Sequence, residues 1–139
     1  MAIEFVISTL IPASVEDVYE AWLNSEIHAK MTGSPASVSA TVGGEFVAWG
    51  GYIHGKNLEL EPGKRILQSW RTAEFSKDEP DSQIEVTLEA VREQTRLTLR
   101  HTGLPPHGTK YEEGWVDAYF QPMKEYFAGL NPGGWGYDY

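Results

Sequence analysis

The chain has 139 residues, no cysteine and a formal net charge of −9 at pH 7. This length suits one globular domain, and the lack of cysteine excludes disulfide bonds and thiolate metal sites. The negative charge disfavours binding to nucleic acid or to an anionic membrane surface, because both need basic patches. No Lys or Arg precedes Lys30 and no apolar run reaches membrane-spanning length. We therefore expect a soluble cytoplasmic protein without a signal peptide or membrane insertion.

The N-terminal quarter of the chain predicts a strand followed by two short helices. Residues 3–11 are rich in β-branched and aromatic residues, and a proline ends this run. Ser14 and Asp17 form a Ser-x-x-Asp pair that begins a helix with apolar residues three and four positions apart. Ser25 is the expected cap of a second short helix, which ends in the Gly- and Pro-containing segment 32–35.

Six further strands follow, separated by short turns of glycine, proline and polar residues. The expected strands are residues 36–41, 45–49, 54–61, 65–72, 83–91 and 95–103. The last two strands alternate between apolar and polar residues, so Val86 in one strand and Leu99 and His101 in the other should point into the core. Short connections between consecutive strands indicate an antiparallel meander.

Residues 109–130 predict a long C-terminal helix. From Trp115 onward, through Tyr119 and Met123, apolar residues recur at three- and four-residue spacing, which marks one helix face. This face carries several aromatic rings and needs a large apolar surface opposite it. The preceding strands form a sheet that can supply one.

Two local features of this helix lead to specific expectations. Thr109 and Glu112 have the spacing of a capping box, which would begin the helix at Thr109. Pro122 lies inside the helix and lacks the N–H that would bond to the carbonyl of Ala118. The helix should therefore bend near Pro122.

The order of elements indicates an α+β helix-grip fold. In this architecture a curved antiparallel sheet of six or seven strands surrounds the long C-terminal helix, with two short helices after the first strand. We expect a single domain over residues 1–130. Residues 131–139 form a tail with three aromatic residues among glycines, expected to be non-helical and either loose or docked as a strap.

Two stretches of the sequence resemble a known family. They are GGEFVAWGGYIHGKNLELEPGKRILQSWR, residues 43–71, and GLPPHGTKYEEGWVDAYFQPMKEYF, residues 103–127. Their paired glycines before a strand, Trp-Arg pair and Gly-Trp near the last helix together resemble the domain homologous to the C-terminal part of the activator of heat-shock-protein-90 ATPase. This AHSA-type family belongs to the START/Bet v 1-like (SRPBCC) superfamily. The resemblance implies a helix-grip fold and a chaperone-associated interaction module linked to the stress response.

The sequence offers little support for catalysis or metal binding. The histidines His28, His54, His101 and His107 lie far apart, without the spacing of a metal site. No nucleotide-binding or nucleophile motif occurs, and the acidic residues are explained as helix caps or solvent-facing strand positions. We expect no cofactor, no metal and no catalytic residue. A cyclase- or hydrolase-type enzyme, as found elsewhere in the superfamily, stays open as an alternative and would need an inward acid–base pair.

The aromatic residues carry the functional prediction. They are more numerous than a dry core of this size needs, although core packing alone is the second interpretation. A curved sheet around one helix tends to leave volume between them, so we expect a cavity that binds a small hydrophobic or aromatic ligand. The expected cavity residues are Trp49, Gln68, Trp70, Val86, Leu99, His101, Trp115, Tyr119 and Met123.

His101 is expected to be the polar marker of this cavity. One ring nitrogen should bond a side chain such as a tyrosine hydroxyl, with the other turned to the cavity, because an unpaired buried polar group is costly. The expected partners of the protein are the small ligand and, alternatively, a chaperone. The protein itself is expected to be a monomer or a homodimer.

Overall fold

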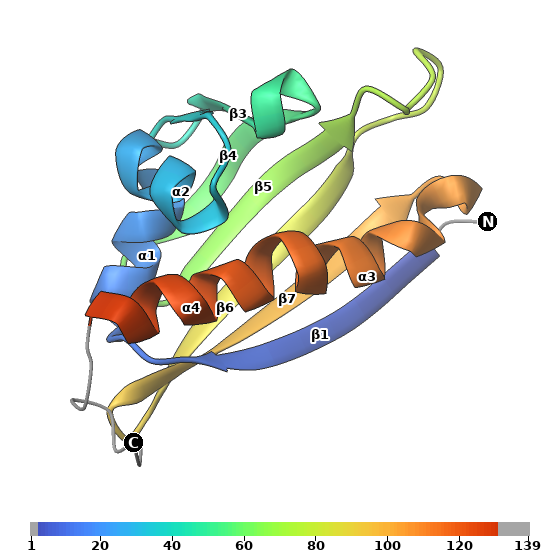
Figure 1. Ribbon diagram of the computed structural model, residues 1–139. Helices are drawn as coiled ribbons and strands as arrows, with labels where there is room; N and C mark the ends of the chain where they lie inside the picture. Colours follow the sequence, from blue (N-terminus) through green and yellow to red (C-terminus); the bar gives the residue numbers. More distant parts are fainter. Residues whose placement is uncertain (1–2, 131–139) are drawn as a thin grey trace.

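The computed structural model describes residues 3–130, and its elements follow the expected order (Figure 1). Strand β1 (Ile3–Ile11) is followed by helices α1 (Val15–Leu23) and α2 (Ser25–Thr32). The remaining strands are β2 (Ala36–Val38), β3 (Glu45–Ala48), β4 (Ile53–Glu61), β5 (Arg65–Thr72), β6 (Ser82–Val91) and β7 (Gln94–Leu104). The expected tail, residues 131–139, lies outside the described residues.

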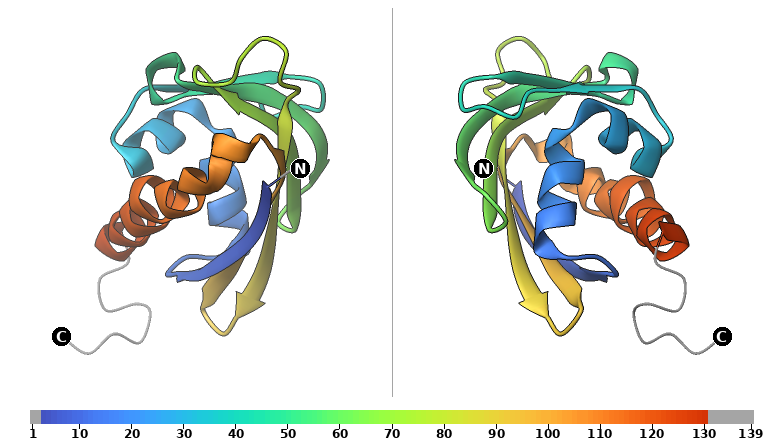
Figure 2. Two further views of the ribbon diagram at one scale, coloured as in Figure 1. Left: turned by 90° about the vertical axis from the view of Figure 1, so that its right-hand side faces the viewer. Right: turned by 90° about the vertical axis from the view of Figure 1, so that its left-hand side faces the viewer.

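The seven strands form one antiparallel sheet in the order β1-β7-β6-β5-β4-β3-β2. Each strand pairs with the next along the chain except β1, which pairs with the last strand, β7. Figure 2 shows the sheet curving around the C-terminal helix, with α1 and α2 on the same concave side. Gly55 permits close packing within this sheet, because a Cβ there would lie 1.9 Å from the carbonyl oxygen of Ser69. The helix-grip prediction is confirmed.

Strand β2 is shorter than predicted. Residues 39–41 leave the ladder, and the side chain of buried Asn57 bonds two of their carbonyl groups. Its Nδ2 donates to the carbonyl oxygens of Ser39 at 2.8 Å and Thr41 at 3.0 Å. A side chain thus satisfies backbone groups that strand pairing would otherwise have used.

The C-terminal segment is helical in four consecutive parts. These are the 3-10 turn η2 (Pro106–Lys110), helix α3 (Tyr111–Trp115), the π turn η3 (Val116–Phe120) and helix α4 (Gln121–Leu130). In the π turn the N–H of Gln121 donates to the carbonyl of Val116, five residues back. Pro122 follows directly, where its missing N–H and its ring disturb a regular α-helix. The irregularity at the proline therefore takes the form of a π turn.

The prediction of a capping box at Thr109 is wrong. Residues 106–110 form the 3-10 turn η2, which places Thr109 inside a turn instead of at a helix start. Helix α3 begins at Tyr111, and no side chain caps it. Two prolines in succession, Pro105 and Pro106, begin this tighter turn before the α-helix starts, and proline is well tolerated in a first helical turn.

Of the two N-terminal helix caps, one is confirmed and one is wrong. Ser14 caps α1, accepting from the N–H of Asp17 at 3.1 Å. Helix α2 is capped by Asn24, one residue before the expected Ser25. The hydroxyl of Ser25 instead accepts from the N–H of Val38 at 2.7 Å, which ties α2 to β2.

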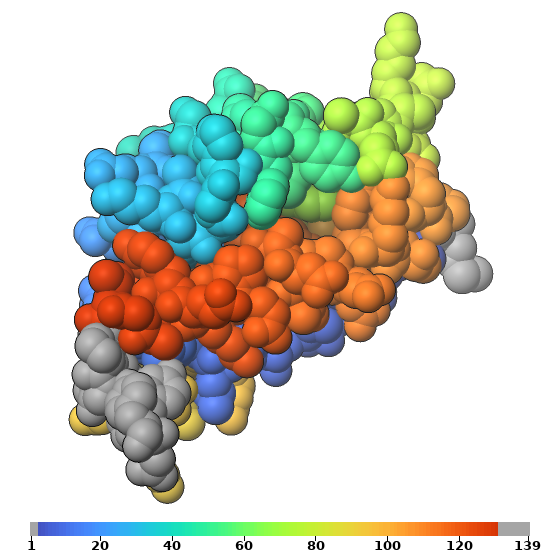
Figure 3. Space-filling model, viewed as in Figure 1, coloured from blue at the N-terminus to red at the C-terminus, as the bar shows by residue number. Residues whose placement is uncertain are grey.

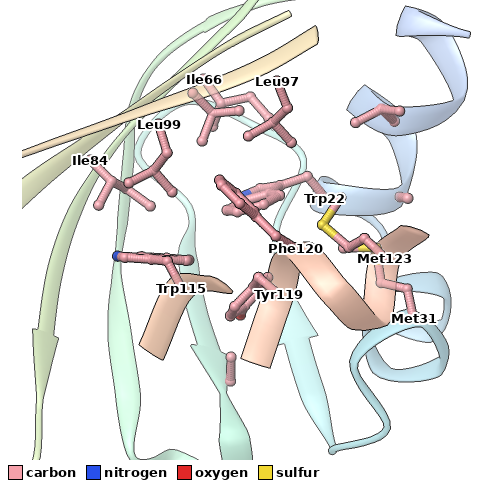
Figure 4. Close-up of a cluster of buried hydrophobic side chains, with 14 of the residues drawn as sticks. Trp22, Met31, Ile66, Ile84, Leu97, Leu99, Trp115, Tyr119, Phe120 and Met123 are labelled. Atoms are coloured by element: carbon pink, nitrogen blue, oxygen red, sulfur yellow. The ribbon is translucent and has the colours of Figure 1, made fainter. Parts of the chain in front are cut away.

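The core lies between the concave face of the sheet and the helices (Figure 4). The predicted inward residues Leu97 and Leu99 of β7 are completely buried, as is Met123 of α4. Trp22 of α1 stacks on Trp115 of α3 with ring centroids 6.1 Å apart. Burial of each such large apolar side chain stabilises the fold by about 1.5–3 kcal/mol.

Candidate functional site

A pocket of about 470 Å³ lies between the 3-10 turn η1 (Trp49–Gly51), the start of β4 and the first part of the C-terminal helical segment. Figure 3 shows the surface hollowed between the green segment that contains η1 and the orange helix. The wall is mostly aromatic. It is formed by Trp49, Tyr52, Ile53, Trp70, Glu74, Lys110, Tyr111, Gly114, Trp115, Ala118 and Tyr119.

The turn η1 places Trp49 on the wall through an unusual backbone. Trp49 has φ 54°, and Gly50 and Gly51 follow with φ 67° and 98°. Three consecutive residues in the left-handed region turn the chain from β3 into β4, and glycine takes this conformation without strain. For Trp49 it costs roughly 1–2 kcal/mol. Such strain is commonly found at functional sites, so this position is a reason to look for function at the pocket.

One end of the pocket is polar. The carboxylate of Glu74, in the loop after β5, accepts hydrogen bonds from the hydroxyl of Tyr52 and from the ammonium group of Lys110. The bonds from Lys110 and then Tyr52 hold the pKa of Glu74 below its usual value. Burial, followed by the bond to Glu74, raises the pKa of Tyr52. These three side chains join the turn between η1 and β4, the β5–β6 loop and η2 around the pocket.

A second polar group of the wall is Tyr119, whose hydroxyl is bound to a buried histidine. The oxygen lies 2.8 Å from Nε2 of His28, and Nδ1 of His28 lies 2.8 Å from the backbone carbonyl oxygen of Trp22. His28 is 3% exposed, and this burial lowers its pKa, which favours the neutral ring. The sequence pattern had indicated no role for His28. Its one signal was helical spacing, because it lies three residues before buried Met31 on the inner face of α2.

His101 does not have the environment that the sequence predicted. Its Nδ1 accepts from the indole N–H of Trp115 at 3.0 Å, and its Nε2 lies 2.9 Å from the hydroxyl of Ser82. Both ring nitrogens are therefore paired inside the protein. One of them bonds a side-chain hydroxyl as expected, that of Ser82 instead of a tyrosine, but the expectation that the other nitrogen is turned to the cavity is wrong. Burial lowers the pKa of His101 to about 3. The physical reason is that the buried indole of Trp115 needs an acceptor of its own.

Four of the nine expected cavity residues line the pocket: Trp49, Trp70, Trp115 and Tyr119. The other five lie in the packed core: Gln68, Val86, Leu99, His101 and Met123. Gln68 is held there by two hydrogen bonds, accepting from the indole of Trp22 at 3.2 Å and donating to Asn57 at 2.8 Å. These five residues therefore belong to the core between the sheet and the helices and do not line the pocket.

Several wall residues are not in the expected cavity set, in particular Tyr52, Glu74, Lys110 and Tyr111. Tyr111 had a usable signal, since it lies four residues before Trp115 and so on the same helix face. The other three come from turns and loops, where hydrophobic periodicity carries no information about direction.

Within residues 3–130, no helix is both long and apolar enough to cross a membrane. In the same range, no group of three or more histidine, aspartate or glutamate side chains is arranged to hold a metal ion.

Comparison with curated proteins finds relatives named as activators of the 90 kDa heat shock protein ATPase. A curated relative from Dictyostelium discoideum, an activator of 90 kDa heat shock protein ATPase homolog, is 32% identical over 114 residues, which cover 81% of this chain and 30% of that protein. The human activator of 90 kDa heat shock protein ATPase homolog 1 is 28% identical over 116 residues, covering 83% of this chain and 34% of that protein. This chain therefore spans about a third of the length of these curated relatives.

The fold comparison and the family model agree with these relatives. The crystal structure of an HSP90 activator from Plasmodium falciparum matches with a TM-score of 0.82 at 21% identity, covering 89% of this chain and 95% of that one. At this identity the match establishes the fold alone. The family model described as Activator of Hsp90 ATPase homolog 1-like protein matches residues 12–128. The chain therefore belongs to the Activator of Hsp90 ATPase homolog 1-like family.

Proposed function

We propose that the aromatic pocket binds a small, largely apolar aromatic ligand, without catalysis. The observation that carries this proposal is the wall itself, in which six aromatic side chains surround about 470 Å³. Small-molecule sites usually have volumes of about 300–1,000 Å³, apolar walls and a few placed polar groups. This pocket has that size, and its polar groups are gathered at Glu74 with its partners and at the hydroxyl of Tyr119.

Two residues of the wall carry buried indole N–H donors that the described protein does not pair. The Nε1 atoms of Trp49 and Trp70 are buried and have no hydrogen-bond partner among the described residues. An unpaired buried donor costs about 1–3 kcal/mol.

Filling the pocket tests the proposal directly. A Cβ at Gly114 would meet nothing within 4 Å, and Gly114 lines the pocket, so Gly114→Leu fills the pocket without a backbone clash. Gly129→Leu is the matched control, because Gly129 is equally open but lies at the far end of α4. In a titration with an anilinonaphthalene sulfonate dye, we expect the wild type and Gly129→Leu to bind and Gly114→Leu to lose at least tenfold in affinity. Equal dye binding by all three proteins would contradict the proposal.

A second candidate function is a chaperone-associated interaction module. The observation that favours it is the family match, together with curated relatives named as activators of the 90 kDa heat shock protein ATPase. This chain covers only about a third of those proteins, so their activity is a proposal here. The cytoplasmic location expected from the sequence is part of this proposal, as is a monomeric or homodimeric state.

Binding of this chain to purified Hsp90, measured by calorimetry together with the Hsp90 ATP turnover rate, tests the second function. We expect binding and a raised turnover rate, and the absence of both would contradict it. Gly114→Leu separates the two candidates, since it fills the pocket and should leave a binding surface elsewhere on the protein intact. We do not propose an enzyme, because the one carboxylate of the described pocket wall, Glu74, is held by Lys110 and Tyr52.

A further inference from the structure

Trp49 is held on the pocket wall in a conformation that two features make unfavourable. Its φ of 54° lies in the left-handed region, which a bulky side chain rarely adopts. Its indole Nε1 is buried and has no hydrogen-bond partner among the described residues. Because both features belong to one residue, a single movement of Trp49 away from the wall would relieve the strain and expose the indole N–H to water.

The other unpaired indole of the wall is held differently. Trp70 packs edge-on against the rings of His101 and Tyr111, with ring centroids 4.5 and 4.9 Å apart. It also lies in β5, which is paired with β4 on one side and β6 on the other. No aromatic ring within residues 3–130 pairs with that of Trp49. Trp49 therefore differs from Trp70 in lacking the contacts that would fix its ring in place.

The backbone confines a movement of Trp49 to a short segment. On one side Ala48 is paired with Ala36 of β2 and with Ile53 of β4. On the other side the carbonyl of Tyr52 accepts from the N–H of Ala73 at 2.9 Å. Only the three residues of the turn η1 lie between these two anchored positions.

The two glycines of η1 give this segment the freedom to move. Gly50 and Gly51 have φ 67° and 98°, and a Cβ at either position would meet nothing within 4 Å. The turn stands out from the end of β3, beside the pocket (Figure 1). Glycine adopts left-handed and right-handed conformations with similar ease, so two glycines next to one bulky residue are suited to a hinge.

We propose that Trp49 is a gate of the pocket, hinged at Gly50 and Gly51, which opens to admit the ligand and closes over it. In the closed state, which the structure describes, Trp49 completes the aromatic wall. In the open state its backbone relaxes and its indole N–H reaches water. A bound ligand packs against the closed ring, so binding and closure stabilise one another. This inference rests on the proposed ligand-binding function and specifies how the ligand enters.

Fluorine NMR of protein labelled with 5-fluorotryptophan measures the gate without any ligand. The resonance of Trp49, assigned by its loss in Trp49→Phe, should show exchange between two states, seen as relaxation dispersion or as a second resonance. The resonance of Trp22, which is buried in the core, should show none. Saturation with the anilinonaphthalene sulfonate dye should remove the exchange at Trp49.

A variant of the hinge gives a second, independent measurement. Gly51→Ala places a side chain at φ 98°, which disfavours the closed turn, so the dye should bind about tenfold more weakly. At dye saturation the fluorine shift of Trp49 should return to the wild-type value, because the closed wall is the same. Gly43→Ala is the matched control, since Gly43 has φ 85° and equally open surroundings but lies before β3, away from the pocket. It should keep the wild-type affinity.

The outcomes separate the gate from the function on which it rests. Dye binding without exchange at Trp49, or with equal affinity for the wild type and Gly51→Ala, would overturn the gate and leave ligand binding standing. An equal loss of affinity in Gly43→Ala would also overturn the gate, because the effect would then not be specific to the hinge. No dye binding by the wild type would overturn the proposed function together with the gate.

Discussion

The two ends of the C-terminal helical segment face the same sheet, but one end is packed and the other is open. At the α4 end, Met123 and Phe127 are buried, and helix α2, with its buried Met31, packs against α4. At the α3 end, the helical segment presents Gly114 and Ala118, four residues apart, and the turn η1, the start of β4 and the loop after β5 lie across the pocket from them. Small side chains at these two positions leave the volume that large ones fill at the other end. The pocket thus follows from side-chain size as much as from the curvature of the sheet.

Figure 4 shows the transition between the two ends. Trp115 and Tyr119 lie at one side of the buried cluster, and Met31 and Met123 lie at the other. Trp115 belongs to both regions, since it lines the pocket and also donates to buried His101. This double role makes it the residue whose loss should affect both ends.

Truncation of Trp115 is the largest expected effect. Trp115→Ala should lower the free energy of unfolding by about 3–5 kcal/mol, the usual range for removing a buried large ring. The ring is 4% exposed, and its loss would also leave His101 without its indole donor. Urea melts measure the change. A loss below about 1 kcal/mol would show that the ring lines an open cavity without supporting the core.

The pH dependence of stability should come from the packed region. Burial lowers the pKa of His101 to about 3, from 6.5 for an ordinary histidine, so the unfolded chain binds more protons than the native one between these values. Stability is therefore complete above pH 6.5 and is lost as the pH falls toward 3. Between pH 7 and pH 5 the loss from this one group should be about 2 kcal/mol.

Two variants identify the source of this pH dependence. His101→Gln keeps an acceptor for the indole of Trp115 but removes the titrating group, so stability should fall less between pH 7 and pH 5. His54→Gln, at an exposed position of β4, is the control and should keep the wild-type slope. An unchanged slope in His101→Gln would contradict the assignment. His28 adds a contribution of the same sign, since burial lowers its pKa as well.

The same contrast explains what the sequence could and could not predict. The bounds of β1 and β5 agree with the predicted ranges, because alternation and turn residues are local signals. The prediction that Val86, Leu99 and His101 point into the core is also confirmed, since all three are completely buried. The alternation of apolar and polar residues in a strand predicts which face of the sheet points to the core. It does not predict whether a helix side chain fills the space next to that face. That depends on Gly114 and Ala118, which lie far away in sequence.

The polar groups of the pocket were hidden for a related reason. His28 and Tyr119 are 91 residues apart, and nothing in either local pattern indicates that they meet. Glu74 and Lys110 come from a loop and a 3-10 turn, which follow no apolar period. Long-range pairs of this kind depend on how elements pack, and a single sequence does not contain that information.

The pocket variant should have the smallest effect on stability. Gly114→Leu and Gly129→Leu each replace a helical glycine at an open position, so each should stabilise the protein by up to about 1 kcal/mol through helix propensity. Thermal melts measure this. A destabilised Gly114→Leu beside a stabilised Gly129→Leu would show that the pocket volume is not free to be filled.

Native mass spectrometry of freshly purified protein tests the central claim most directly. If the open α3 end is a ligand site, the wild type and Gly129→Leu should each retain a small molecule there. The spectrum of each protein would then show a discrete added mass. Gly114→Leu, with its pocket filled, should lack that mass. A bound molecule that persists unchanged in Gly114→Leu would contradict the claim that the open α3 end is the ligand site.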